Sequence, residues 1–152
     1  MNRGFKKSVL FIFMAIAGGA LAWVFFLRSG ETLPLVFIQG ADVPVSVTVV
    51  DSPDTRQKGL SRHPGLAENE GMFFVFNAPE ILSFWMKDML FAIDIIWISS
   101  DWRIVDITKN ITPETYPDTF SPAMPVQYVL EVSAGFVDAN NVKIGQSVEL
   151  KK

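Results

Sequence analysis

The 152-residue chain contains no cysteine and a single histidine, His63. The lack of cysteine excludes disulfide bonds, thiolate metal sites, iron–sulfur clusters and a cysteine nucleophile. One histidine without cysteine partners does not make a zinc site, and this one stands in a turn-like sequence with no recognisable serine nucleophile nearby. The sequence therefore predicts no metal and no cofactor.

Positive charge is scarce beyond the first 30 residues. Of the 13 basic residues, four precede residue 31, so the rest of the chain carries nine basic against 16 acidic residues, a net charge of −7. A domain of this charge repels phosphate backbones. We therefore expect no nucleic-acid partner.

A long apolar run occurs at residues 9–27, where 19 consecutive residues are apolar or glycine. This length suits a helix that crosses a bilayer, and Lys6 and Lys7 before it favour a cytoplasmic N-terminus. We therefore expect a membrane anchor or signal segment over residues 1–30, and a single β-rich globular domain over residues 31–152. The domain would lie outside the cytoplasm (in the periplasm), held by one span in the cytoplasmic membrane.

The alternative to an anchor is a signal peptide that is cleaved. Ala20-Leu21-Ala22 matches a cleavage site, and residues 9–17 would serve as its apolar region. In that case the domain would be secreted. Against cleavage, the new N-terminus would begin with the apolar residues 23–27, where a more polar sequence is usual.

Short apolar runs separated by turn residues make up the rest of the chain. Ser52 as a cap and Gly59 as an end residue predict a short helix between them, and a second short helix is expected within 133–140. With 49% hydrophobic residues for a core, we predict a mainly β (β-rich α+β) fold. It would be a compact, barrel-like antiparallel sheet with one or two short helices, preceded by an N-terminal transmembrane helix. Strands are expected at 35–38, 43–50, 72–76, 103–108, 127–132 and 147–150.

Residues 83–98 stand out because charged residues interrupt an otherwise apolar stretch. A β-hairpin that turns between Leu90 and Phe91 would place Lys87 opposite Asp94. Facing residues of an antiparallel pair share one face of the sheet and touch. Because charges on an apolar face are costly unless they are paired, we expect an ion pair between Lys87 and Asp94.

A candidate binding site follows from this pair. We expect Glu131 to join it, with Trp85 in its apolar wall and Arg62 and Glu70 as outer members. Burial and neighbouring charges shift the pKa of such groups towards useful values, so the cluster could bind a polar ligand or exchange protons. The structural alternative is a partly buried salt bridge that only sets the register of the hairpin.

Several sequence blocks occur together in a characteristic order. They are GMFFVF at 71–76, FWMK at 84–87, VLEV at 129–132 and the pair Ala134-Gly135. In this order they resemble the prokaryotic family called domain of unknown function 192, over roughly residues 44–150. The resemblance implies a compact β-rich domain that is often exported or anchored at its N-terminus, and it implies no established activity.

Three functions remain open at this point. The first is a non-catalytic, membrane-tethered extracytoplasmic domain that binds a small polar ligand or an envelope partner protein. The second is an enzyme acting on an envelope sugar or peptide, with Asp94 or Glu131 as general acid or base and Lys87 holding an anion. The third is a structural accessory of an envelope complex, in which the cluster serves only the fold.

Overall fold

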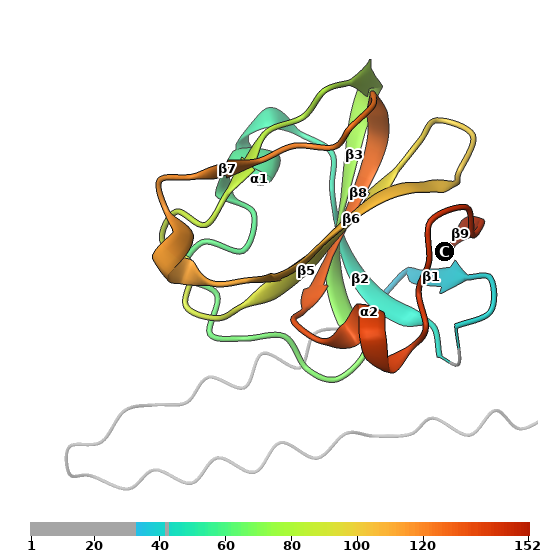
Figure 1. The fold of residues 1–152 in the computed structure, drawn as a ribbon, viewed down its shortest axis with the longest axis horizontal. Helices are drawn as coiled ribbons and strands as arrows, with labels where there is room; N and C mark the ends of the chain where they lie inside the picture. The colour runs from blue at the N-terminus through green and yellow to red at the C-terminus, as the bar shows by residue number, and fades with distance from the viewer. Residues whose placement is uncertain (1–32, 42) are drawn as a thin grey trace, which may run out of the picture. The chain divides into compact units, whose positions relative to one another are not determined.

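The computed structural model describes residues 33–41 and 43–152 (Figure 1). The predicted membrane segment, residues 9–27, lies outside these residues. Within them, no helix has the length and apolar character needed to cross a membrane. The described chain is mainly β, with two short α-helices, α1 (Pro53–Lys58) and α2 (Phe136–Ala139), and a 3₁₀ turn η1 (Pro113–Thr115). The strands are β1 (Leu35–Ile38), β2 (Val45–Val50), β3 (Glu70–Glu80), β4 (Phe84–Trp85), β5 (Ile93–Ile98), β6 (Ile104–Ile111), β7 (Thr119–Phe120), β8 (Val126–Ser133) and β9 (Val148–Lys151).

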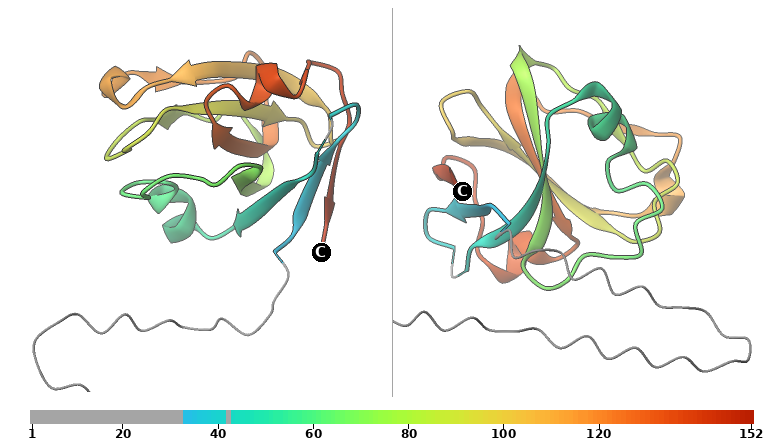
Figure 2. Two further views of the ribbon diagram at one scale, coloured as in Figure 1. Left: turned by 90° about the horizontal axis from the view of Figure 1, so that it is seen from below. Right: turned by 180° about the vertical axis from the view of Figure 1, so that it is seen from behind.

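Seven strands form one curled sheet in the order β6-β5-β8-β3-β2-β1-β9, a half-barrel in outline (Figures 1 and 2). Neighbouring strands are antiparallel except β2 and β3, which run parallel. The prediction of an antiparallel sheet is therefore wrong in this place. A parallel neighbour needs a crossover connection, and α1 with the segment after it carries the chain back before β3 begins. β4 and β7 form a separate two-stranded ribbon.

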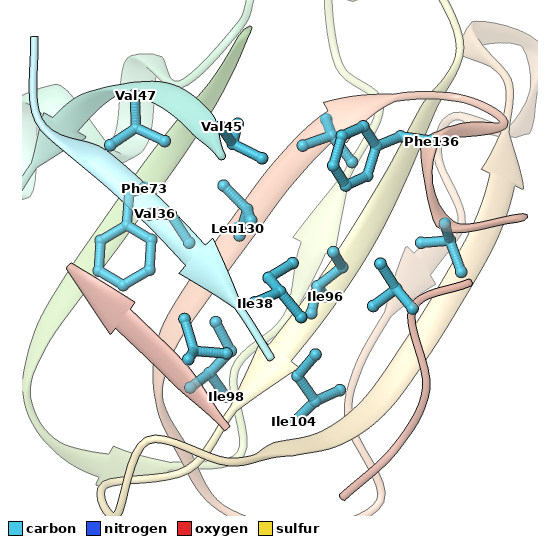
Figure 3. Close-up of a cluster of buried hydrophobic side chains, with 14 residues drawn as sticks. Val36, Ile38, Val45, Val47, Phe73, Ile96, Ile98, Ile104, Leu130 and Phe136 are labelled. Carbon is cyan, nitrogen blue, oxygen red and sulfur yellow. The ribbon is translucent and has the colours of Figure 1, made fainter. Parts of the chain in front are cut away.

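Successive residue pairs of β3 and β8 face two different clusters of buried hydrophobic side chains. Phe73 of β3 pairs with Leu130 of β8, and both belong to the first cluster (Figure 3). The next pair, Phe74 and Val129, belongs to the second cluster. Because successive side chains of a strand point to opposite faces, the two clusters lie on opposite sides of these strands. Figures 1 and 2 show α1 and β7 on one side of β3 and β8, and β1 and β9 on the other.

β5 is buried along its whole length. Ile96 and Ile98 contribute to the first cluster, and Ile95 and Trp97 to the second. Because both of its faces are covered, the strand is a continuous apolar run rather than an alternating one. Asp94 is the one polar residue within it.

The predicted helix after Ser52 is confirmed as α1. The Ser52 hydroxyl accepts a hydrogen bond from the Thr55 amide at 3.3 Å, and the Ser52 amide donates one to the Thr55 hydroxyl at 3.2 Å. This reciprocal pair is a capping box, and Gly59 ends the helix. The second helix, α2, is shorter than the predicted range and follows Gly135, whose lack of a side chain leaves the helix without a cap of its own.

The predicted hairpin over residues 83–98 does not form. β4 pairs with β7, whereas β5 lies between β6 and β8. Residues 86–92 connect β4 to β5 instead of folding one strand onto the other. The physical reason is that both edges of β5 find partners much longer than the two-residue β4, and each added pair contributes backbone hydrogen bonds and side-chain burial.

Candidate functional site

Glu131 is an acidic residue on an apolar face of the sheet. β8 sets it beside Met72 of β3 and Ile95 of β5, on the face of the second cluster. The residue is only 5% exposed, and its Oε2 is buried without a hydrogen-bond partner. Burial disfavours the charged form and raises the pKa of the Glu131 carboxyl to about 8. At neutral pH the carboxyl is therefore mostly protonated.

Glu131 lines a cavity of about 230 Å³ whose walls are largely aromatic. Phe74 and Phe76 of β3 and Phe84 and Trp85 of β4 form these walls. Trp85 is 52% exposed, which places it at the mouth, whereas Glu131 lies at the buried end. Apolar walls with few polar groups are typical of small-molecule sites. The name aromatic cavity is used for this site below.

Contacts between aromatic rings hold the walls in place. The Phe84 ring meets Phe74 with 5.0 Å between centroids and Trp97 with 5.4 Å, in nearly perpendicular arrangements. Edge-to-face pairs of this kind are favourable beyond their buried area. The pairing of β4 with β7 adds backbone support for Phe84 and Trp85. The wall residues of β3 and β4 are therefore supported by β5 and β7, which come later in the chain.

The other side of the aromatic cavity comes from α1 and the turn after it. Arg56 is half-buried there and Lys58 is exposed. Nη1 of Arg56 donates hydrogen bonds to the carbonyl oxygens of Asp51 and, at 2.9 Å, of Val75. The guanidinium also lies 4.8 Å from the centre of the Phe76 ring, a cation–π arrangement. These contacts fix the position of one positive charge beside the cavity.

Asp94 does not reach the aromatic cavity. Its register partner on β8 is Val132, whereas the partner of Ile95 is Glu131. Adjacent positions of a strand face opposite sides of the sheet. The two carboxyl groups that the sequence analysis combines into one cluster therefore lie on opposite faces.

The Asp94 carboxylate has a structural role. It is 0% exposed and accepts hydrogen bonds from the backbone amides of Asn110 at 2.8 Å, Gly135 at 3.0 Å and Val137 at 3.1 Å. The first amide belongs to β6 and the other two to the start of α2. Asp94 therefore supplies from a distant strand the N-terminal cap that Gly135 cannot provide.

Lys87 is exposed in the connection between β4 and β5. Its carbonyl oxygen accepts a hydrogen bond from the Ser61 hydroxyl at 3.0 Å, so the residue is tied to the domain through its backbone. The predicted ion pair between Lys87 and Asp94 is wrong, because the hairpin that would bring them together is absent and backbone amides occupy the Asp94 carboxylate.

The two predicted outer members do not line the aromatic cavity either. Arg62 makes an exposed ion pair with Asp88, with 3.8 Å between Nη2 and Oδ2. Glu70 accepts a hydrogen bond from the Ala67 amide at 2.7 Å and lines a second cavity, of about 350 Å³, beside α2. Of the six residues predicted for the site, Trp85 and Glu131 line the aromatic cavity.

Arg56 and Lys58 are members of the site that the sequence does not point to. None of the residues of α1 is buried, so the helix has the character of an ordinary surface helix. Nothing in the local sequence connects it with β8, which comes much later in the chain. The aromatic residues of β3 and β4, in contrast, are recognisable in the sequence as a buried wall.

The fold and the aromatic cavity together define a small half-barrel domain with one buried acid in its cavity. The chain belongs to the DUF192 family, described as "Uncharacterized ACR, COG1430", whose family model matches residues 35–150. The resemblance found in the sequence is thus confirmed. No curated protein matches the chain.

Two solved structures are similar to the described domain. One is a protein of unknown function from Novosphingobium aromaticivorans DSM 12444, with 28% sequence identity and a TM-score of 0.71, over 76% of this chain and 83% of that one. The other, from Sinorhizobium meliloti 1021, is called a "putative transcription regulator" and has 29% identity and a TM-score of 0.72, over 80% of this chain and 98% of that one. Both support the fold, and neither name assigns a ligand.

Proposed function

We propose that the chain is a binding protein whose aromatic cavity holds a small organic ligand, with Glu131 as the polar group that orients it. The observation that carries this proposal is the carboxyl of Glu131: the residue lines the cavity, and its buried Oε2 has no hydrogen-bond partner among the described residues. A buried polar atom without a partner costs about 1–3 kcal/mol. A polar ligand atom in the cavity would supply the missing partner.

The proposal includes a location. Residues 9–27 would tether the domain to the cytoplasmic membrane and leave it outside the cytoplasm, where it could meet a diffusible ligand or an envelope partner protein. The apolar run and the basic residues before it support this arrangement. The Sinorhizobium meliloti relative is called a "putative transcription regulator", but a net charge of −7 beyond residue 30 argues against a nucleic-acid partner for this chain.

A second candidate function is acid–base catalysis in the same cavity. Burial raises the pKa of Glu131 to about 8, and a carboxyl that stays protonated at neutral pH can act as a general acid. Among the described residues, however, no second carboxylate and no histidine lines the aromatic cavity. A base or nucleophile would have to come from the substrate or from water, so binding without catalysis is the better-supported function.

The test replaces Glu131 with leucine in the full chain, purified in detergent. Because the unpaired polar atom disappears, we expect the free energy of unfolding to rise by about 1–2 kcal/mol. We also expect the variant to lose every ligand that a thermal-shift screen of small acids, amines, amino acids and sugars finds for the wild type. Glu149→Leu, the same change at an exposed strand position, is the matched control.

Two results would contradict the binding proposal. One is a loss of stability above about 1 kcal/mol on Glu131→Leu, which would mean that the carboxyl supports the fold. The other is a set of ligands that stabilise the wild type and the Glu131→Leu variant equally, which would move the binding site elsewhere. Turnover of a screened compound that Glu131→Leu abolishes would favour the enzyme instead.

A further inference from the structure

Charge is separated by sign along the aromatic cavity. Glu131 lies at the buried end on β8, whereas Arg56 and Lys58 come from α1 on the side that is open to solvent. No other charged residue lines the cavity in the part of the chain that the structure describes. A ligand that fills the cavity therefore meets one buried acid and two cations that are nearer to solvent.

The surroundings of Glu131 leave its charge state open to control by a ligand. Its register partners on β3 and β5 are the apolar Met72 and Ile95. Burial is the cause of the raised pKa of Glu131. A positive ligand group beside the Glu131 carboxyl would favour the charged form, because opposite charges in a low-dielectric site attract strongly.

The walls between the two ends also suit a positive group. Phe74, Phe76 and Phe84 line the cavity, and the Phe76 ring already lies against the Arg56 guanidinium. Aromatic faces attract cations, most strongly where water is excluded. On the solvent side, Nη1 of Arg56 donates hydrogen bonds to backbone carbonyl oxygens. Because a guanidinium has five N–H donors, Arg56 can also donate hydrogen bonds to an acidic group of a ligand.

We propose that the ligand is a zwitterion, a small molecule with an ammonium group at one end, an acidic group at the other and an apolar spacer between them. The ammonium group pairs with the Glu131 carboxylate at the buried end. The acidic group pairs with Arg56 and Lys58 at the mouth, and the spacer lies against the aromatic walls. This inference rests on the proposed function of the same cavity and adds the class of ligand.

A simple anion is the competing ligand class, because a protonated Glu131 could donate a hydrogen bond to it. The two classes differ in their coupling to pH. In the protein without ligand the pKa of Glu131 is about 8. Binding of a zwitterion that needs the carboxylate therefore releases about 0.9 proton per ligand at pH 7, and the affinity falls about tenfold from pH 7 to pH 6. An anion that uses the protonated acid releases no proton, and its affinity does not fall over this range.

The experiment measures binding of matched compounds to the full chain in detergent by isothermal titration calorimetry. The zwitterions are glycine, β-alanine, 4-aminobutanoate, 5-aminopentanoate and 6-aminohexanoate, and hexylamine and hexanoate each lack one charged end. We expect one of the longer zwitterions to bind at least tenfold more tightly than hexylamine or hexanoate. Titration in two buffers of different ionisation enthalpy should give the predicted proton release.

Two variants and one control assign the ends of the ligand. Glu131→Gln keeps the size of the side chain but cannot ionise, so it should weaken the zwitterion and hexylamine at least tenfold and leave hexanoate unchanged. Lys58→Gln, at an exposed position, should weaken the zwitterion and hexanoate several-fold and leave hexylamine unchanged. Lys143→Gln, another exposed lysine that does not line the cavity, should change none of them.

The inference is overturned if hexanoate binds as tightly as the zwitterions without proton release, or if the series fails to bind. A series that fails while other screened compounds still bind in a Glu131-dependent way leaves the proposed binding function standing. Failure of both the series and the screen would remove the binding function as well.

Discussion

Asp94 and Glu131 are two buried acids on neighbouring strands, one rung apart, and the protein treats them in opposite ways. On the first-cluster face, three backbone amides surround the Asp94 carboxylate. On the second-cluster face, Glu131 has apolar neighbours and an Oε2 without a partner. Similar burial thus accompanies two different electrostatic environments.

The difference separates a structural acid from a candidate functional one. A carboxylate that accepts several amide hydrogen bonds is satisfied by the fold, and its removal leaves those amides unpaired. A buried carboxyl without partners contributes little to the fold and keeps its bonding capacity for something else. Burial by itself is therefore a poor guide to function, and the hydrogen-bond partners are the better one.

The largest effect should come from Asp94→Ala, since it leaves three buried amides without an acceptor and uncaps α2. We expect the free energy of unfolding to fall by about 4 kcal/mol in urea titrations. Asp118→Ala, at an exposed position, is the matched control and should change little. If Asp94→Ala lowers the free energy of unfolding by less than about 1 kcal/mol, Asp94 is not the structural acid described above.

A somewhat smaller effect should appear in the pH dependence of stability. The pKa of Glu131 rises from its ordinary value of 4.5 to about 8 in the folded protein, so the folded state binds more protons than the unfolded state between these values. Its contribution to the free energy of unfolding should therefore fall by about 3 kcal/mol as the pH rises from about 5 to about 8, and then level off.

Urea titrations of wild type and Glu131→Gln at several pH values isolate this contribution, because glutamine does not titrate. The stability difference between the two proteins should change with pH by the amount given above. Parallel curves would show that the carboxyl has its ordinary pKa, and the contrast with Asp94 would weaken.

The smallest effect is expected at Lys87. Because its side chain is exposed and makes no ion pair with Asp94, Lys87→Met should leave the urea midpoint unchanged and the affinity for any cavity ligand within twofold. If Lys87 paired with Asp94 in a binding site, as predicted from the sequence, Lys87→Met would instead cause a strong loss of binding. A tenfold loss would bring Lys87 back into the site.

The sequence predicts the local features of this fold well. The capping residues mark α1, and alternating or continuous apolar runs mark most strands. It also singles out Asp94 and Glu131 as members of a candidate site. Local propensity and periodicity depend on residues close together in the chain, and a single sequence contains that information.

The partners of each strand could not be predicted in the same way. Lys87 and Asp94 were expected to meet because their segments are adjacent in the chain, yet β4 pairs with β7 and β5 with β8. Pairing depends on long-range competition between strands. A shift of one residue in register also moves a side chain to the other face of the sheet.

By itself, the sequence determined the mainly β class, the short helices, the family and the acidic charge beyond residue 30. Only the tertiary structure decided that Asp94 caps α2 while Glu131 lines a cavity together with aromatic residues and Arg56. The physical reason is that burial, pKa and hydrogen-bond partners are properties of the assembled sheet. They arise when β3, β5, β8 and α1 come together, and none of these segments contains them alone.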